Sequence, residues 1–503
     1  MNSPDKLPTP NFSKLVAWIE LHPVRALTVF VTLHFAVWTA LPTILYANLP
    51  LDVIEGLNYG REWQLGYDKL PPLPWWLLEI AHAAWGRDVA YYMLAEIAVV
   101  STLILIFATA LPLVGSVGAI VATLIIDGLH YLNFSSVKFN HNVIELPFWA
   151  LVGFSFCASL RSGRIIDWAL LGVALGFAFW AKYFVVVLAL PLVLFFILDR
   201  EARPMLATPG PWIALTVALV VAAPHIAWLI AHDFLPFQYV DARAAPSRGL
   251  LDHLFHPLQA IALQLIALLP ALVIGSPLAW PPQIAALNAR PDYLSYRAVT
   301  LLAFGPIATL ALLSLVTGKG TIASWGFPVW IFFGIWFVIK AEAVIKTVQL
   351  IRVVILWAVV STIFVIAFIA DYTILPYLDH RYRAVFFPGE ELAADLTQRF
   401  HAAIGEPLRY VIGTMWDGGN VAHYSPDQPE VLIDGLPRRA PWIDLNDLRA
   451  KGALVVWTVG DPEHLPAAFA AIAPTAEVEP PFTLPMRRAG GVVHVGWAIL
   501  KPQ

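Results

Sequence analysis

Long apolar segments recur along most of this chain, and they restrict its fold more than any other feature. The first, Ala26 to Ala47, follows Lys14 and Arg25, is long enough to cross a bilayer as a helix, and has no small-residue cleavage pattern behind it. We therefore expect a retained membrane span, not a signal peptide. A window of about 19 residues predicts about eleven spans, at 25–46, 91–110, 113–131, 142–160, 165–181, 183–198, 211–231, 257–277, 298–317, 324–340 and 351–371.

Charged residues are scarce in the first part of the chain and common in the last. They make up 13% of the 503 residues, against about 25% in soluble domains. Residues 373–503 hold 26 charged side chains, whereas the first 372 residues, nearly three times as many, hold 40. We expect a polytopic α-helical membrane domain over 1–372 and a soluble domain over 373–503.

The net charge of −4 argues against a nucleic-acid partner, which would require a basic face. The single cysteine, Cys157, excludes a disulfide framework and any multi-cysteine metal site.

The last 131 residues alternate amphipathic stretches with short apolar runs, which is the pattern of an α/β domain. Two helices are predicted, at 389–404 and 445–450. Three strands are predicted, at 409–413, 431–433 and 454–459.

Arginine pairs indicate the sidedness of the spans. If Lys14 and Arg25 are cytoplasmic, alternation places Arg161 with Arg164, and Arg200 with Arg203, on the cytoplasmic side as well. This distribution satisfies the positive-inside rule. It predicts an odd number of spans, a cytoplasmic N-terminus, and a non-cytoplasmic first loop (47–90) and tail.

Two acidic residues and a tyrosine follow the first span. Asp52, Glu55 and Tyr59 are spaced so that they share one face of a helix. A carboxylate at the boundary of water and lipid is well placed to act as a general base. The alternative is structural, because Asp52 followed by Glu55 is also close to a capping-box pattern.

A lysine stands before a proline-rich turn in the same loop. Asp68 and Lys69 precede Pro71-Pro72, and residues 75–85 carry the apolar side of a helix suited to the membrane interface. A cation held ahead of such a turn could bind a lipid phosphate. The alternative is a solvated lysine that snorkels to the interface.

In their order along the chain, these motifs resemble those of the bacterial family 39 glycosyltransferases of the GT-C class, which are related to the protein O-mannosyltransferases and to the aminoarabinose transferase that modifies lipid A. The resemblance covers nearly the whole chain. Its motifs are the acid after the first span, the Asp68-Lys69-x-Pro-Pro element, Lys138 to Asn142, Ala181 to Tyr183, Pro224-His225 with Trp228, His232 to Phe234, and Lys319 with Trp325 and Pro328.

The resemblance implies an enzyme of the bacterial inner membrane with its tail in the periplasm. It would transfer one sugar, with inversion, from a polyprenyl-phosphate donor to a periplasmic cell-envelope acceptor: lipid A or lipopolysaccharide, another glycolipid, a glycan or a protein. No cofactor is obligatory, although a divalent metal is compatible with the family.

Carried over by motif, Asp52 matches the catalytic aspartate, Lys69 the lysine that neutralises the donor phosphate, and Lys138 a second cation. Asn142 stands where many relatives have an aspartate, so either Glu145 replaces that acid or the acid is dispensable. Asp68 and His232 match two metal ligands. Further candidate substrate-binding residues are Tyr59, Arg61, Asn142, Lys182 and Lys319, and the two lysines could equally anchor span ends.

Other functional classes remain open from the sequence. A lipid-linked sugar flippase or transporter would place acids near the bilayer midplane, whereas Glu96 and Asp127, the main acids within the spans, lie near a predicted span end or one turn inside. A receptor or scaffold with a glycan-binding tail is a third class, which holds if Asp52 is only a cap.

Overall fold

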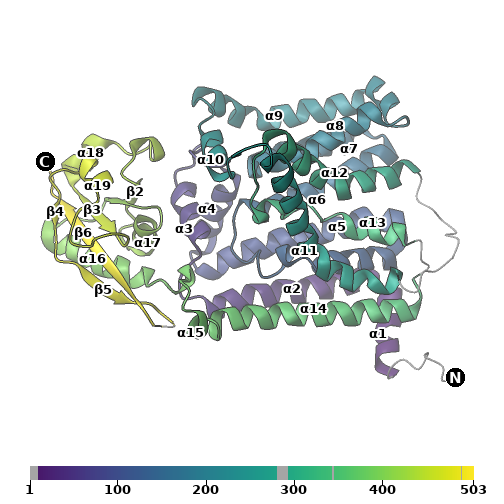
Figure 1. Ribbon diagram of the computed structural model, residues 1–503, viewed down its shortest axis with the longest axis horizontal. Helices are drawn as coiled ribbons and strands as arrows, with labels where there is room; N and C mark the ends of the chain where they lie inside the picture. The colour runs from purple at the N-terminus through teal and green to yellow at the C-terminus, as the bar shows by residue number, and fades with distance from the viewer. Residues whose placement is uncertain (1–9, 280–292, 342–344, 489) are drawn as a thin grey trace. The chain divides into compact units, whose positions relative to one another are not determined.

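The computed structural model describes residues 10–279, 293–341, 345–488 and 490–503. Within these ranges, seven helices are long and apolar enough to cross a membrane. Together with the small sheet domain near the C-terminus, they confirm the predicted fold class (Figure 1). The seven are α2 (Pro23–Leu45), α5 (Asp88–Asp127), α6 (His141–Ser162), α9 (Pro209–Ala231), α11 (Asp252–Ala279), α12 (Tyr293–Thr317) and α14 (Thr347–Thr373).

Shorter helices complete the helical part of the chain. They are α1 (Pro10–Leu21), α3 (Leu51–Gly60), α4 (Leu73–Trp85), α7 (Ile165–Ala181), α8 (Val186–Leu198), α10 (Leu235–Arg243), α13 (Phe333–Lys340) and α15 (Pro376–Asp379). The predicted break at Lys182 is present as one extended residue and a 3-10 turn. The segment predicted at 324–340 is helical only from Phe333, because turns occupy 327–332, where Pro328 lacks the N–H that a continuous helix would need.

Helix α5 folds back on itself at Gly115, where φ is 72° and ψ is 176°. In one continuous helix, residues 96 and 127 would lie about 46 Å apart. Both carboxylates nevertheless contact His34 of α2: Nε2 lies 3.4 Å from Glu96 and Nδ1 3.1 Å from Asp127. The two predicted spans at 91–110 and 113–131 are therefore the two arms of this broken helix.

The tail is an α/β domain with strand order β2-β1-β3-β6-β4, and β5 pairs with the other end of β6. β2, β1 and β3 are parallel, whereas β6 runs antiparallel to β3. The strands are β1 (Tyr410–Gly413), β2 (Glu430–Ile433), β3 (Ala453–Trp457), β4 (Glu477–Val478), β5 (Phe482–Pro485) and β6 (Val492–Leu500), and the helices are α16 (Gly389–Ile404), α17 (Asp417–Tyr424), α18 (Leu445–Lys451) and α19 (Ala467–Ile472).

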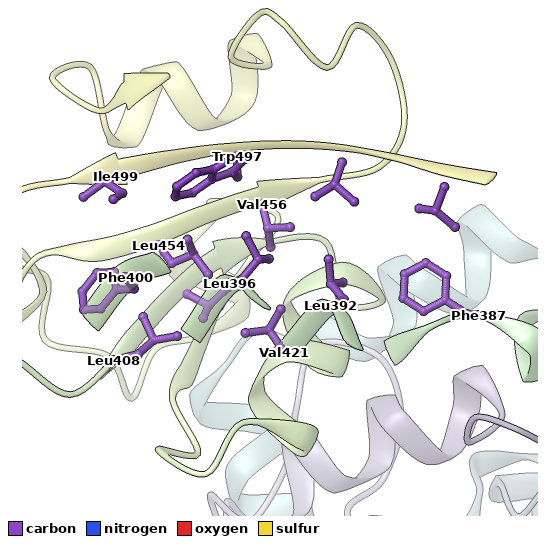
Figure 2. Packing of buried hydrophobic residues seen from close by; sticks show 13 residues of the cluster. Phe387, Leu392, Leu396, Phe400, Leu408, Val421, Leu454, Val456, Trp497 and Ile499 are labelled. Carbon is purple, nitrogen blue, oxygen red and sulfur yellow. The ribbon is translucent and has the colours of Figure 1, made fainter. Parts of the chain in front are cut away.

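Apolar cores cover both faces of this sheet. Figure 2 shows one of them, in which Leu392, Leu396 and Phe400 of α16 pack with Leu454 and Val456 of β3. The core on the opposite face of the sheet includes the buried side chains of Leu448 from α18 and Phe469 from α19. Strands β1 and β3 are buried along their whole length, as expected of parallel strands covered on both sides.

The chain forms two compact units. Of the described residues, the first unit comprises those within 1–40, 69–73 and 93–367, and the second comprises those within 41–68, 74–92 and 368–503. Within the second unit, the Asn58 amide of α3 donates to the Gly419 carbonyl at 3.4 Å, so most of the first loop packs with the tail. The boundary predicted at residue 372 stays a prediction, because compactness does not measure which parts fold alone.

Replacing Gly115 should destabilise the protein through the backbone alone. No atom lies within 4 Å of an added Cβ, but the φ/ψ pair is one that only glycine adopts easily. We expect Gly115→Ala to cost about 1–3 kcal/mol, measured as reduced resistance to denaturant in detergent. Gly249→Ala, also with open space around its Cβ and no positive φ, is the matched control. Equal stability of the two variants would contradict a strained break.

Candidate functional site

The candidate base Asp52 lies in the first turn of α3. The helix is capped by Pro50, which makes no side-chain capping bond, and Asp52 is the second helical residue. The capping-box interpretation of Asp52 is therefore wrong, because the N-cap position is residue 50, two residues before Asp52. Asp52 is exposed and sits where the helix dipole favours a negative charge, whereas Glu55, one turn on, is buried.

Two glycines allow α4 to approach α3 closely. A Cβ on Gly60 would lie 2.2 Å from the Trp75 carbonyl oxygen, and one on Gly56 would lie 2.3 Å from Leu78. This contact buries Tyr59 completely, with its ring stacked on Trp75 at 4.4 Å. Helix α3 is consequently held in one position against α4.

The Tyr59 hydroxyl donates a 2.6 Å hydrogen bond to Oδ1 of Asp68. Burial raises the pKa of Tyr59 well above its ordinary value, so the neutral phenol is the donor. Arg439 of the tail donates from Nε to Oδ2 of the same carboxylate at 2.8 Å. Sequence reasoning missed Arg439, which follows Asp68 by 371 positions and belongs to no motif.

The metal that the resemblance allows does not fit these contacts. Both oxygens of Asp68 accept hydrogen bonds, one from a phenol and one from a guanidinium. His232 has its Nδ1 at 2.8 Å from the Trp228 carbonyl and stacks on that indole. In the part of the chain that the structure describes, no group of three or more His, Cys, Asp and Glu side chains could hold a metal. We therefore derive no step through a metal.

Lys69 belongs to the first compact unit, in the segment 69–73. Its ammonium lies 5.4 Å from the centre of the Tyr239 ring of α10. Two residues later the Pro71 carbonyl is 2.9 Å from Nε2 of His141, the first residue of α6. Lys138, the predicted second cation, is half-buried in the loop before α6.

Lys182, Asn142 and Glu145 come together inside the first unit. The Lys182 ammonium donates to Asn142 Oδ1 at 2.7 Å and lies 3.1 Å from Glu145 Oε2. Both charged groups are buried: the side chain of Lys182 is 9% exposed and that of Glu145 is 0% exposed. Lys319 in turn forms an ion pair with Asp241. These two lysines are thus anchored by carboxylates, and their contact with substrate stays a prediction.

Arg61 links the first loop to the tail. Its two terminal nitrogens donate to the carbonyls of Gln428, at 2.7 Å, and Pro429, at 3.2 Å. Its neighbour Glu62 is a titratable group that no motif indicated. Burial and the nearby Glu430 raise the pKa of Glu62 to about 7.

Comparison with known proteins agrees with this architecture. The family model for dolichyl-phosphate-mannose-protein mannosyltransferases matches residues 69–228. No protein of curated function matches the chain by sequence. ArnT from Cupriavidus metallidurans, solved with bound undecaprenyl phosphate, is similar in structure with a TM-score of 0.62 at 13% identity, over 95% of this chain and 99% of ArnT. The apo form of ArnT is similar with a TM-score of 0.61, at the same identity and coverage.

These similarities confirm the resemblance to GT-C membrane glycosyltransferases that the loop motifs indicate. The chain is a multi-pass membrane protein with the GT-C fold and a small C-terminal sheet domain.

Removing one partner of the buried Lys182–Glu145 pair should be much worse than removing both. Lys182→Met leaves a carboxylate buried without a cation, which costs about 3–5 kcal/mol. The double variant Lys182→Met/Glu145→Gln should regain most of that stability in the same denaturant titration. Lys451→Met, which breaks an exposed pair with Asp447, should change stability by less than about 1 kcal/mol. A double variant no more stable than Lys182→Met would show that the pairing is not what stabilises this contact.

Glu62 should make stability depend on pH between its ordinary pKa and its raised one. The folded protein binds a proton at Glu62 more tightly than the unfolded chain does, so its contribution is full at low pH and is lost as pH rises toward about 7. Glu62→Gln should therefore have a higher Tm than the parent at pH 8, and the difference should shrink toward pH 4.5. Glu406→Gln, at an exposed position, is the control. A pH-independent difference would contradict this assignment.

Proposed function

We propose that this protein is an inverting glycosyltransferase that moves a single sugar from a polyprenyl-phosphate donor to an acceptor of the bacterial cell envelope. The observation that carries the proposal is the fold shared with ArnT over 95% of the chain, since ArnT was solved with bound undecaprenyl phosphate. The match to the mannosyltransferase family model over residues 69–228 supports the same reaction class.

The chemistry requires a base for the acceptor and positive charge for the leaving group. The acceptor oxygen attacks the anomeric carbon from the face opposite the phosphate, and the bond from that carbon to the phosphate oxygen breaks. Polyprenyl phosphate leaves as an anion, whose growing charge is stabilised by preorganised cations. The acceptor proton passes to a carboxylate.

Asp52 is the group to which we assign the proton. It is exposed in the first turn of a helix that begins six residues after the first span ends, so an acceptor can reach it. Glu55 is the second candidate, one turn away and buried. We assign the phosphate charge to Lys69 and, with it, Lys138.

The orientation proposed from the basic loops places this chemistry on the periplasmic side of the inner membrane. The N-terminus is then cytoplasmic, and the first loop and the tail are periplasmic. The acceptor is a lipid A or lipopolysaccharide group, another glycolipid, a glycan or a protein.

The reaction can be tested with the purified protein in detergent or nanodiscs. Radiolabelled polyprenyl-phosphate sugars and total envelope lipid should yield a labelled acceptor and free polyprenyl phosphate. Movement of the donor between leaflets without a new glycosidic bond would instead establish a flippase.

Asp52→Asn should abolish turnover and leave the fold intact. Asparagine has nearly the same shape but cannot accept the proton, and a general base contributes about 10²- to 10⁴-fold. Donor binding and Tm should stay close to those of the parent. Glu55→Gln is the matched control, and an active Asp52→Asn with an inactive Glu55→Gln would move the base by one helical turn. If Asp52→Asn and Glu55→Gln each lose less than about tenfold in turnover, neither carboxylate is the general base.

A further inference from the structure

Asp68 and Lys69 are adjacent in the chain, but their side chains are held by different parts of the fold. The Asp68 carboxylate belongs to the second compact unit, where Tyr59 and Arg439 hold it. Lys69 belongs to the first unit, where His141 holds the Pro71 carbonyl two residues on. Lys69 therefore directly follows a residue whose side chain is fixed within the second unit.

The contact on Asp68 is strong by its chemistry and its burial. Arg439 and Asp68 side chains are 15% and 14% exposed, and their 2.8 Å contact joins a full positive to a full negative charge. Such charge-assisted hydrogen bonds are about twice as strong as neutral ones. Arg439 Nη2 also reaches the Tyr59 hydroxyl at 3.3 Å, so three side chains close one hydrogen-bonded ring.

Arg439 is itself held firmly. It ends a 3-10 turn (Pro437–Arg439) that follows strand β2, and it forms a second ion pair with Asp434 just after that strand. The backbone N–H of Asp434 donates to the Gly413 carbonyl at 2.8 Å, at the end of the neighbouring strand β1. The guanidinium is thus fixed to the end of the parallel sheet.

We propose that Arg439 is a positioning residue for the donor-phosphate cation: it clamps Asp68 and thereby fixes the backbone that carries Lys69. The guanidinium supplies the positive charge at Asp68, so this carboxylate needs no metal ion. The inference rests on the proposed function, since it takes Lys69 as the residue that contacts the donor phosphate.

The test combines a measurement of the clamp with a measurement of donor use, on the full-length protein in nanodiscs. Arg439→Ala should increase backbone hydrogen exchange in a peptide covering residues 62–73. It should also raise the KM for the polyprenyl-phosphate sugar by about tenfold or more, with a smaller change in kcat. Arg439→Lys keeps the positive charge but loses the paired N–H donors of the guanidinium, so its hydrogen exchange and its KM should lie between those of the parent and of Arg439→Ala. This conservative variant keeps the test valid if Arg439→Ala fails to fold. Arg438→Ala, at the exposed neighbouring position, should match the parent.

A double-variant cycle identifies the path of the effect. If Arg439 acts through Asp68, then Asp68→Asn/Arg439→Ala should have a KM no higher than the worse single variant. A chelator should leave activity unchanged. Additive effects, or activity that a chelator abolishes and a divalent metal restores, would overturn the proposal.

The failure of the clamp and the failure of the function give different results. Unchanged hydrogen exchange in Arg439→Ala would show that Arg439 does not fix this segment, whatever the reaction is. Increased exchange with normal donor KM would overturn the link to Lys69. If Arg439→Ala increases exchange but the parent protein binds no polyprenyl phosphate and transfers no sugar, the clamp stands while the proposed function, and with it the role assigned to Lys69, is overturned.

Discussion

Charged groups enclosed by apolar helices must be paired, and this requirement shapes the helical part of the chain. His34 meets one carboxylate from each arm of the broken helix α5, and Trp357 of α14 donates to Asp127 at 2.7 Å. Leaving one of these charges without a partner in a medium of low dielectric would cost several kcal/mol. Apolar contacts fill the space between helices without much direction, whereas these polar contacts decide which helices are neighbours.

The sequence predicts the helices and strands of this fold better than the contacts between them. Apolar length predicts nearly all the long helices, and amphipathic spacing predicts α16 with the bounds that the structure gives, 389–404. The strands at 410–413 and 430–433 also lie within a residue of their predicted positions. Hydropathy does not predict the irregular stretch at 327–332, because that stretch is as apolar as the helix that follows it.

Pairings between distant side chains are the part that sequence could not provide. The motifs indicate Lys182 and Glu145 as separate candidate site residues, but only the fold shows that the two side chains form an ion pair. Arg439 belongs to a tail that looks like an ordinary α/β domain, and its partner lies in the first loop. The capping alternative for Asp52 fails for a local reason, since Pro50 occupies the N-cap position two residues before the acid.

Strand β6 has a consequence for the order in which the tail becomes stable. It lies beside β3 in the sheet, yet Val492 follows Trp457 by 35 positions, with β4 and β5 between them, both of which also pair with β6. Until Val492–Leu500 has been synthesised, the apolar strand β3 presents an open edge and two further strands have no partner. An open apolar edge is a template for pairing with other chains. The emerging tail is therefore most prone to aggregate through β3 in the interval before β6 is available to pair with it.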